Sequence, residues 1–141
     1  MVRLMLLRHA KSDWAVPELA DHDRPLSSRG ERAAPLIGAV MRQRDYRPVR
    51  ALCSTATRAR ETLRLALGKL GGGIETEFTR KIYEAGPNEL LALARSSNGG
   101  ARSLLMVGHN PAFQDAALAL AGSGEERDLA LMAAKFPTGA L

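Results

Sequence analysis

Residue types suited to phosphate chemistry stand at three separate places in the sequence. They are Arg8 with His9, Ser54 with Arg58, and His109 with Asn110. A neutral imidazole attacks phosphorus through a ring nitrogen and needs no separate base to do so. Arginine side chains and helix N-termini stabilise the negative charge of a phosphoryl group during its transfer. If the fold brings these places together, they favour phosphoryl transfer, with one histidine as nucleophile and the other as a donor to the phosphoryl oxygens.

Each of these places directly follows a stretch that is typical of a buried strand. Residues 2–7, 49–53 and 103–107 are almost uninterrupted apolar runs. Residues 74–78 indicate a further short strand. A long polar loop, residues 11–27, follows the first strand.

The segments between the strands carry apolar residues at helical spacing. Ser28 and Glu31 form a capping-box pattern, so the first helix is expected to begin at Ser28, and Pro35 predicts a kink or a later start. Later helices are expected to begin at Thr57, at Pro87, and at Pro111 with Asn110 as its N-cap. The second of these four helices ends at the glycines of residues 71–73, and the last is expected to face inward through Phe113, Ala117 and Leu120.

Strands that alternate with helices predict an α/β fold. We expect a single domain over residues 1–141, with three αβα layers around a mostly parallel central sheet. In such sheets the binding site lies in the loops beyond the carboxyl ends of the strands. The candidate residues should therefore meet at one edge. The positive charges of Arg8 and Arg58 there disfavour protonation of the neighbouring histidines.

Five blocks of the sequence then point to a known family. They are Arg8-His9-Ala10-Lys11-Ser12-Asp13-Trp14, Asp23-Arg24-Pro25-Leu26-Ser27-Ser28-Arg29-Gly30, Ser54-x-x-x-Arg58-Ala59-x-x-Thr62, Ile82-Tyr83-Glu84-Ala85 and Val107-Gly108-His109-Asn110-Pro111. In this order they resemble the histidine phosphatase superfamily, and within it the SixA-type phosphohistidine phosphatase branch. The resemblance covers roughly residues 2–123 and implies a phosphoglycerate-mutase-like fold.

The resemblance also implies roles for individual residues. His9 would be the nucleophile and would carry the phosphoryl group transiently. The phosphate pocket would comprise Arg8, Arg58 and His109, with Ser54 and Asn110 as further substrate-binding residues. Glu84 stands where the superfamily commonly has its proton donor. Because a nitrogen leaving group needs less acid help than an alkoxide, we expect Glu84 to matter more for phosphate esters than for phosphohistidine.

The sequence departs from larger relatives in two respects. The segment between the second predicted helix and Glu84 is short, which predicts an open, shallow pocket that suits a phosphate displayed on a protein. Relatives of this type usually continue with a further strand after the position of Leu141. We therefore expect the domain to lack a C-terminal strand, which would leave one sheet edge unpaired.

Charge and composition bound the partners and the setting. There are 20 basic residues, 16 of them arginine, against 15 acidic ones, so an anionic partner is expected: a phosphorylated protein or a small phosphate ester. The six aromatic residues are scattered, so no nucleic-acid partner is expected.

The single cysteine, Cys53, rules out an intramolecular disulfide and favours the cytoplasm. No run of apolar residues is long enough for a membrane span, and no zinc-ligand spacing is present, so we expect no membrane association, no metal and no cofactor. The oligomeric state is left open.

Other functions and roles stay open at this point. The protein could be a general small-molecule phosphatase or mutase-like enzyme, or a non-catalytic module that binds a phosphorylated ligand or nucleic acid. The candidate residues could also have purely structural roles. His9 and His109 could be buried structural histidines, and Arg58 could be an ion-pair partner of Glu31 or Glu61. Glu84 could be an ion-pair partner of Lys81, and Trp14 with Lys11 could anchor a loop instead of lining a substrate entrance.

Overall fold

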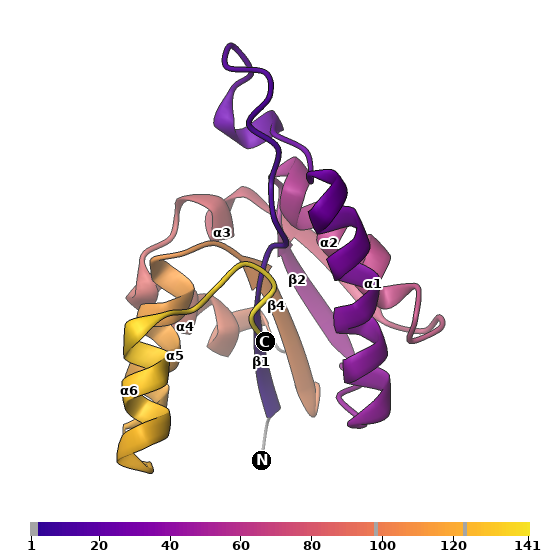
Figure 1. The fold of residues 1–141 in the computed structure, drawn as a ribbon. Helices are drawn as coiled ribbons and strands as arrows, with labels where there is room; N and C mark the ends of the chain where they lie inside the picture. Colours follow the sequence, from indigo (N-terminus) through magenta and orange to yellow (C-terminus); the bar gives the residue numbers. More distant parts are fainter. Residues whose placement is uncertain (1–2, 98, 123) are drawn as a thin grey trace.

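Among the described residues, four parallel strands form the central sheet, in the order β1–β4–β2–β3. Figure 1 labels β1, β4 and β2. The computed structural model describes residues 3–97, 99–122 and 124–141. In chain order the elements are β1 (Arg3–Arg8), the short 3-10 helix η1 (Asp21–Asp23), α1 (Ser28–Gln43), β2 (Arg50–Ser54), α2 (Thr57–Leu67), β3 (Glu75–Thr79), α3 (Arg80–Glu84), α4 (Pro87–Ser97), β4 (Ser103–Gly108), α5 (Ala112–Ala121) and α6 (Glu126–Ala134). The predicted α/β class with a parallel sheet is confirmed.

Helices cover both faces of this sheet, which confirms the three-layer αβα arrangement. α1 and α2 pack on one face, and α4 and α5 pack on the other, with α6 against α5 (Figure 1). Successive side chains of a strand point to opposite faces. In β4, Leu105 and Val107 therefore join the core under α1 and α2, while Leu104 and Met106 join the core under α4 and α5. Packing on both faces fixes β4 and the residues that follow it.

The first two helices differ from expectation at their ends. α1 begins at Ser28, as predicted, but its N-cap is Ser27 and not Ser28: the Ser27 side-chain oxygen accepts a hydrogen bond from the Gly30 amide at 3.1 Å. α1 then continues through Pro35 to Gln43, so of the two effects predicted for Pro35, a kink or a later start, the later start is wrong. α2 ends at Leu67, ahead of the glycine run, with Gly68 as its C-cap.

The C-terminal helices differ from expectation more than the others do. α5 begins one residue later than predicted, and Asn110 Oδ1 accepts a hydrogen bond from the Gln114 amide at 3.3 Å. The buried face of α5 comprises Phe113 and Ala116, whereas Leu120 is 53% exposed, so its predicted inward position is wrong. The short α3 and the whole of α6 were not predicted. α6 has no buried residue and therefore no strong apolar face for a pattern to detect.

Residues 136–140 cross the carboxyl end of β1, the outer strand beside β4. The Arg8 amide donates to the carbonyl oxygen of Ala140 at 3.0 Å, and the Gly139 amide donates to that of Arg8 at 3.1 Å. This end of β1 is therefore fixed on one side by β4 and on the other by the C-terminal segment.

Candidate active site

A hollow of about 340 Å³ lies beyond the carboxyl ends of β1 and β4. Its lining comprises Arg8, His9, Lys11, Ser12, Trp14, Asp21, Arg58, His109, Asn110 and Thr138. The fold thus brings together the candidates Arg8, His9, Arg58, His109 and Asn110. Ser54, at the end of β2, lies behind the hollow and contacts His109. Residues that are far apart in the sequence meet here because β4 lies between β1 and β2.

His9 is buried, with 7% of its surface exposed. Its Nδ1 lies 2.7 Å from the carbonyl oxygen of Ala10. A carbonyl oxygen can only accept, so Nδ1 carries the ring proton and Nε2 keeps its lone pair. Burial, followed by the charges of Arg58 and Arg8, lowers the pKa of His9 to about 4, against the opposing effect of the Ala10 contact. The imidazole is therefore neutral at pH 7, and Nε2 is available as a nucleophile.

Arg58 enters the site from the first turn of α2 and is itself buried. Its Nε lies 3.4 Å from Nε2 of His9, and its Nη2 lies 3.4 Å from Nδ1 of His109. Both distances are long for hydrogen bonds between nitrogens. A phosphoryl oxygen is a better acceptor for a guanidinium than either ring nitrogen. The space between the two histidines and Arg58 is therefore suited to an anionic oxygen.

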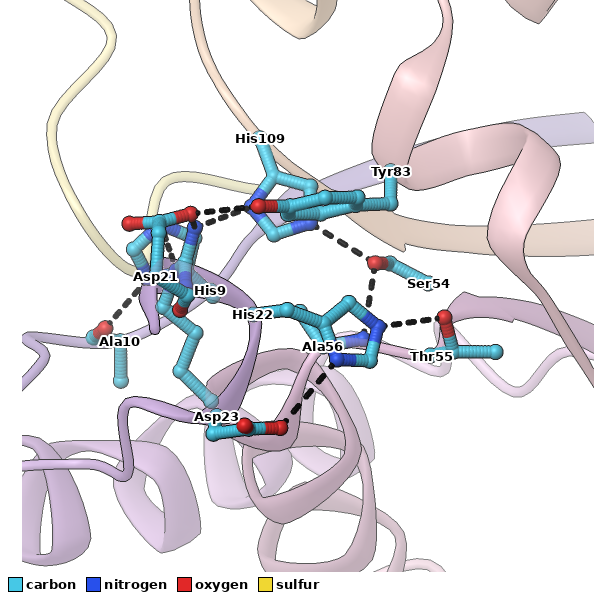
Figure 2. A network of polar contacts seen from close by, with 11 residues as sticks. His9, Ala10, Asp21, His22, Asp23, Ser54, Thr55, Ala56, Tyr83 and His109 are labelled. Carbon is cyan, nitrogen blue, oxygen red and sulfur yellow. Dashed lines mark hydrogen bonds and ion pairs between the residues drawn. The ribbon is translucent and has the colours of Figure 1, made fainter. Parts of the chain in front are cut away.

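His109 follows β4 and faces His9, with ring centroids 5.2 Å apart. Because Arg58 can only donate, Nδ1 of His109 accepts from it and Nε2 carries the proton. Nε2 then donates to Oγ of Ser54 at 2.8 Å (Figure 2). Burial, followed by the proximity of His9 and of Arg58, lowers the pKa of His109 to about 3. The site therefore holds both imidazoles in their neutral forms at pH 7.

Thr62 connects the segment that carries His9 to the helix that carries Arg58. Its side chain is fully buried. Its hydroxyl oxygen accepts from the Ala10 amide at 3.0 Å, and the hydroxyl donates to the carbonyl oxygen of Arg58 at 2.7 Å. Ala10 in turn fixes the His9 ring. Thr62 belongs to one of the sequence blocks, but no role was assigned to it from the sequence.

Arg8 and Asn110 share one anchor, the carbonyl oxygen of Phe136. Arg8 Nη1 donates to it at 2.9 Å and Asn110 Nδ2 at 3.0 Å. Among the described residues, the buried Nε of Arg8 has no hydrogen-bond partner. Burial, and then the charge of Arg58, lowers the pKa of Arg8. Arg8 lines the hollow, where an anion would offset the repulsion from Arg58.

Asp21 and Tyr83 belong to the same network, and reasoning from the sequence missed both. Asp21 Oδ2 accepts from Arg58 Nη2 at 3.0 Å and from the Tyr83 hydroxyl at 2.8 Å (Figure 2). The Tyr83 ring meets His109 edge-on, with centroids 5.4 Å apart. Burial acts to raise the pKa of Asp21, but the hydrogen bonds from Tyr83 and Arg58 outweigh it and lower that pKa. Tyr83 belongs to one of the five sequence blocks that resemble the family, so that block could have pointed to it, whereas Asp21 lies in none of them.

Glu84 is not among the described residues that line the hollow. It ends α3 with its side chain exposed, and its Oε1 accepts from Arg80 Nε at 3.0 Å. It instead lines a separate hollow with Lys81 and Glu89. The ion-pair partner expected from the sequence was Lys81, but the partner in the structure is Arg80. The role of Glu84 as a proton donor stays a prediction.

The rim of the hollow carries an exposed aromatic side chain. Trp14 is 62% exposed, and the guanidinium of Arg24 stacks over its ring at 4.1 Å from the centroid. Arg24 itself is buried and donates to the carbonyl oxygen of Val16 at 3.3 Å. Lys11 lies on the same rim and is exposed. Trp14 therefore both anchors its loop and borders the entrance.

Two other kinds of feature are absent from the described residues. These residues contain no group of three or more His, Cys, Asp or Glu side chains that could hold a metal ion. They also contain no helix that is long and apolar enough to cross a membrane. Cys53 is fully buried in β2, and burial raises the pKa of its thiol, so it is a small core residue rather than a reactive one.

Comparison with known proteins agrees with this geometry. The sequence model of the histidine phosphatase superfamily (branch 1) matches residues 4–93. An uncharacterized protein of Mycobacterium leprae is 38% identical over 141 residues, covering 96% of this chain and 84% of the relative. The name of this relative gives no function, so it carries no argument about a substrate.

Two solved structures are similar over almost the whole chain. The putative phosphohistidine phosphatase SixA from Agrobacterium tumefaciens is 34% identical, with a TM-score of 0.87 over 98% of this chain and 87% of that one. The putative phosphohistidine phosphatase SixA from Nakamurella multipartitia is 31% identical, with a TM-score of 0.73 over 97% of this chain and 78% of that one.

Proposed function

Because the chain belongs to the histidine phosphatase superfamily and is of its SixA type, we propose that it removes the phosphoryl group from phosphohistidine on a protein, through a covalent intermediate on His9 and without a metal ion. The observation that carries this proposal is the state of His9. The ring is neutral and is fixed by Ala10 through Nδ1, and its Nε2 faces Arg58 and the space in front of His109.

In the first step, Nε2 of His9 attacks phosphorus. The new P–Nε2 bond forms as the P–N bond to the substrate histidine breaks, and the departing imidazole takes a proton from water. His9 keeps its Nδ1 proton on the Ala10 carbonyl, so the phosphorylated ring carries a positive charge. That charge makes it a good leaving group.

In the second step, water attacks phosphorus and the P–Nε2 bond breaks. His9 returns to its neutral form with the proton still on Nδ1, and the proton lost by the water goes to solvent or to the released phosphate. Arg58 and Arg8, which both line the hollow, would stabilise the charge on the phosphoryl oxygens in both steps. An anion here also favours a proton on Nδ1 of His109, which would then become a donor to it.

Two features support phosphohistidine as the substrate over a phosphate ester. An alkoxide leaving group needs an acid beside it, whereas the exposed Glu84 points to Arg80 in a separate hollow. The rim with Trp14 and Lys11 offers an exposed surface on which a protein could rest. The names of the Agrobacterium and Nakamurella proteins agree with this substrate.

The test compares two substrates in the presence of a metal chelator: a protein phosphorylated on histidine with phosphoramidate, and an aryl phosphate. We expect kcat/KM to be higher for the phosphorylated protein. His9→Ala should lose activity by about four orders of magnitude. Glu84→Gln serves as the matched variant at an acidic position, and its activity on phosphohistidine should stay within about twofold of the wild type.

Other outcomes would replace the proposal. A higher kcat/KM for the aryl phosphate would indicate a small-molecule phosphatase. A wild type that hydrolyses neither substrate but binds inorganic phosphate as tightly as His9→Ala does would indicate a binding module. Activity that disappears with chelator and returns with a divalent cation would contradict the metal-free mechanism.

A further inference from the structure

The guanidinium of Arg58 makes contacts along two different edges. Along its terminal edge, Nη1 donates to the backbone carbonyl of Asp21 at 2.6 Å and Nη2 donates to its carboxylate Oδ2 at 3.0 Å. Along its other edge, Nε and Nη2 face His9 and His109, each at 3.4 Å. A guanidinium is planar and its N–H groups have fixed directions. Whatever holds the terminal edge therefore also sets the direction of the other one.

We propose that Asp21 is a positioning residue, which holds the terminal edge of Arg58 so that the Nε–Nη2 edge points at the phosphoryl group between His9 and His109. The inference deepens the proposed function and rests on it, because it assigns a role to a residue that lines the hollow but is not one of the expected phosphate ligands. Asp21 acts through Arg58 and is not expected to touch the phosphoryl group.

Asp21 is suited to this role because its own position is fixed from two sides. The Tyr83 hydroxyl, from α3, donates to the same Oδ2 at 2.8 Å. The next residue, His22, places Nε2 2.8 Å from Oγ1 of Thr55, just before α2, and its ring meets Tyr83 edge-on with centroids 4.9 Å apart (Figure 2). The short helix η1 is thereby tied to both elements that flank the pocket.

A different role, in which Asp21 competes with phosphate for Arg58, fits the contacts less well. A competitor would occupy the edge that faces the nucleophile. Asp21 instead occupies the terminal edge. The Nε–H group and one N–H group of Nη2 remain directed at the two histidine rings. Phosphate can therefore bind while Asp21 stays in place, as the positioning role requires.

The test is a double-mutant cycle of Asp21→Ala with Arg58→Ala, read out by calorimetric binding of inorganic phosphate and by kcat/KM. Alone, Asp21→Ala should weaken phosphate binding and lower kcat/KM by the same factor, about 30-fold. In the Arg58→Ala background it should change either value by less than about twofold, because its partner is already absent. Asp21→Asn, which keeps an acceptor oxygen, should recover part of the loss.

Two further variants separate positioning from folding. Asp23→Ala removes a carboxylate from the same short helix, where it pairs only weakly with His22 at 3.5 Å, and should leave phosphate binding unchanged. Tyr83→Phe should weaken binding by about threefold in the wild type and not at all in Asp21→Ala. Both of these results are independent of whether the mutant proteins are slightly less stable.

Three results would overturn the inference. They are an equal loss from Asp21→Ala with and without Arg58, tighter phosphate binding by Asp21→Ala, and an equal loss from Asp23→Ala. Phosphate binding does not depend on which substrate the enzyme hydrolyses. If the wild type fails on phosphohistidine while the cycle behaves as expected, the proposed function fails and the role of Asp21 stands.

Discussion

The stability of the protein should fall steeply between pH 7 and pH 5 because His9 and His109 are held neutral. Their pKa values in the folded protein are about 4 and about 3, against an ordinary value of 6.5. As the pH falls below 6.5, the unfolded chain takes up protons at these positions before the folded chain does. The unfolded state is therefore stabilised until the folded pKa values are reached.

The size of the effect follows from the width of that window. Each histidine lowers the free energy of unfolding by up to about 1.4 kcal/mol per pH unit, or by about 2 kcal/mol between pH 6.5 and pH 5. Together the two could remove about 4 kcal/mol, a large share of the ~5–15 kcal/mol that holds a typical domain folded. The pKa of Asp21 is lowered from its ordinary value of 3.8, so its contribution to stability is lost only as the pH falls below about that value. It therefore does not add to the loss between pH 7 and pH 5.

Urea unfolding at a series of pH values measures this dependence directly. The free energy of unfolding of the wild type should fall toward pH 5, and His9→Gln and His109→Gln should each remove about half of the slope. The slope is the relevant quantity, because either substitution also changes stability at pH 7. A wild-type free energy of unfolding that stays constant within about 1 kcal/mol between pH 7 and pH 5 would refute the reasoning.

Two more substitutions test the scaffold and the rim. Thr62→Val keeps the shape of the side chain but leaves the buried Ala10 amide without its acceptor, so thermal or urea unfolding should show a loss of about 1–3 kcal/mol together with a lower kcat. Thr62→Ser should keep kcat, and a kcat that falls equally in both variants would contradict the hydrogen-bond explanation. Trp14→Ala should raise KM about tenfold for a protein phosphorylated on histidine and leave KM for free phosphoramidate unchanged. Leu131→Ala, at an equally exposed position on α6, is the control, and an equal rise in KM there would exclude a specific contact.

The sheet and the meeting point of the site could be predicted because parallel strands leave a strong signal. A strand such as β4 is buried on both faces and reads as a continuous apolar run. The rule that ligands bind beyond the carboxyl ends of such strands then located Arg8, His9 and His109 without side-chain coordinates. Helix ends were less predictable, because Ser27 and Ser28 are both good N-caps and the fold selects between them.

The supporting contacts of the site could not be predicted, for two physical reasons. Asp21 lies 37 residues from Arg58, in a polar loop with several acidic residues, and nothing local distinguishes it from Asp23. The anchor of Arg8 and Asn110 is a backbone carbonyl, that of Phe136, and every residue type has one. Such contacts depend on the tertiary structure, and the residue types in the sequence do not reveal them.

The pairing of β1 with β4 determines when during folding the pocket can exist. Leu7 lies opposite Val107, and Arg8 bonds to a carbonyl 128 residues further along the chain. During synthesis His9 emerges early, whereas His109 and the Phe136 carbonyl that holds Arg8 emerge much later. Closing such long loops costs chain entropy before any contact compensates for it, so these pairings form late. A partly folded chain therefore carries His9 as an ordinary solvated histidine, and the buried, neutral His9 beside Arg58 exists only once these pairings have formed.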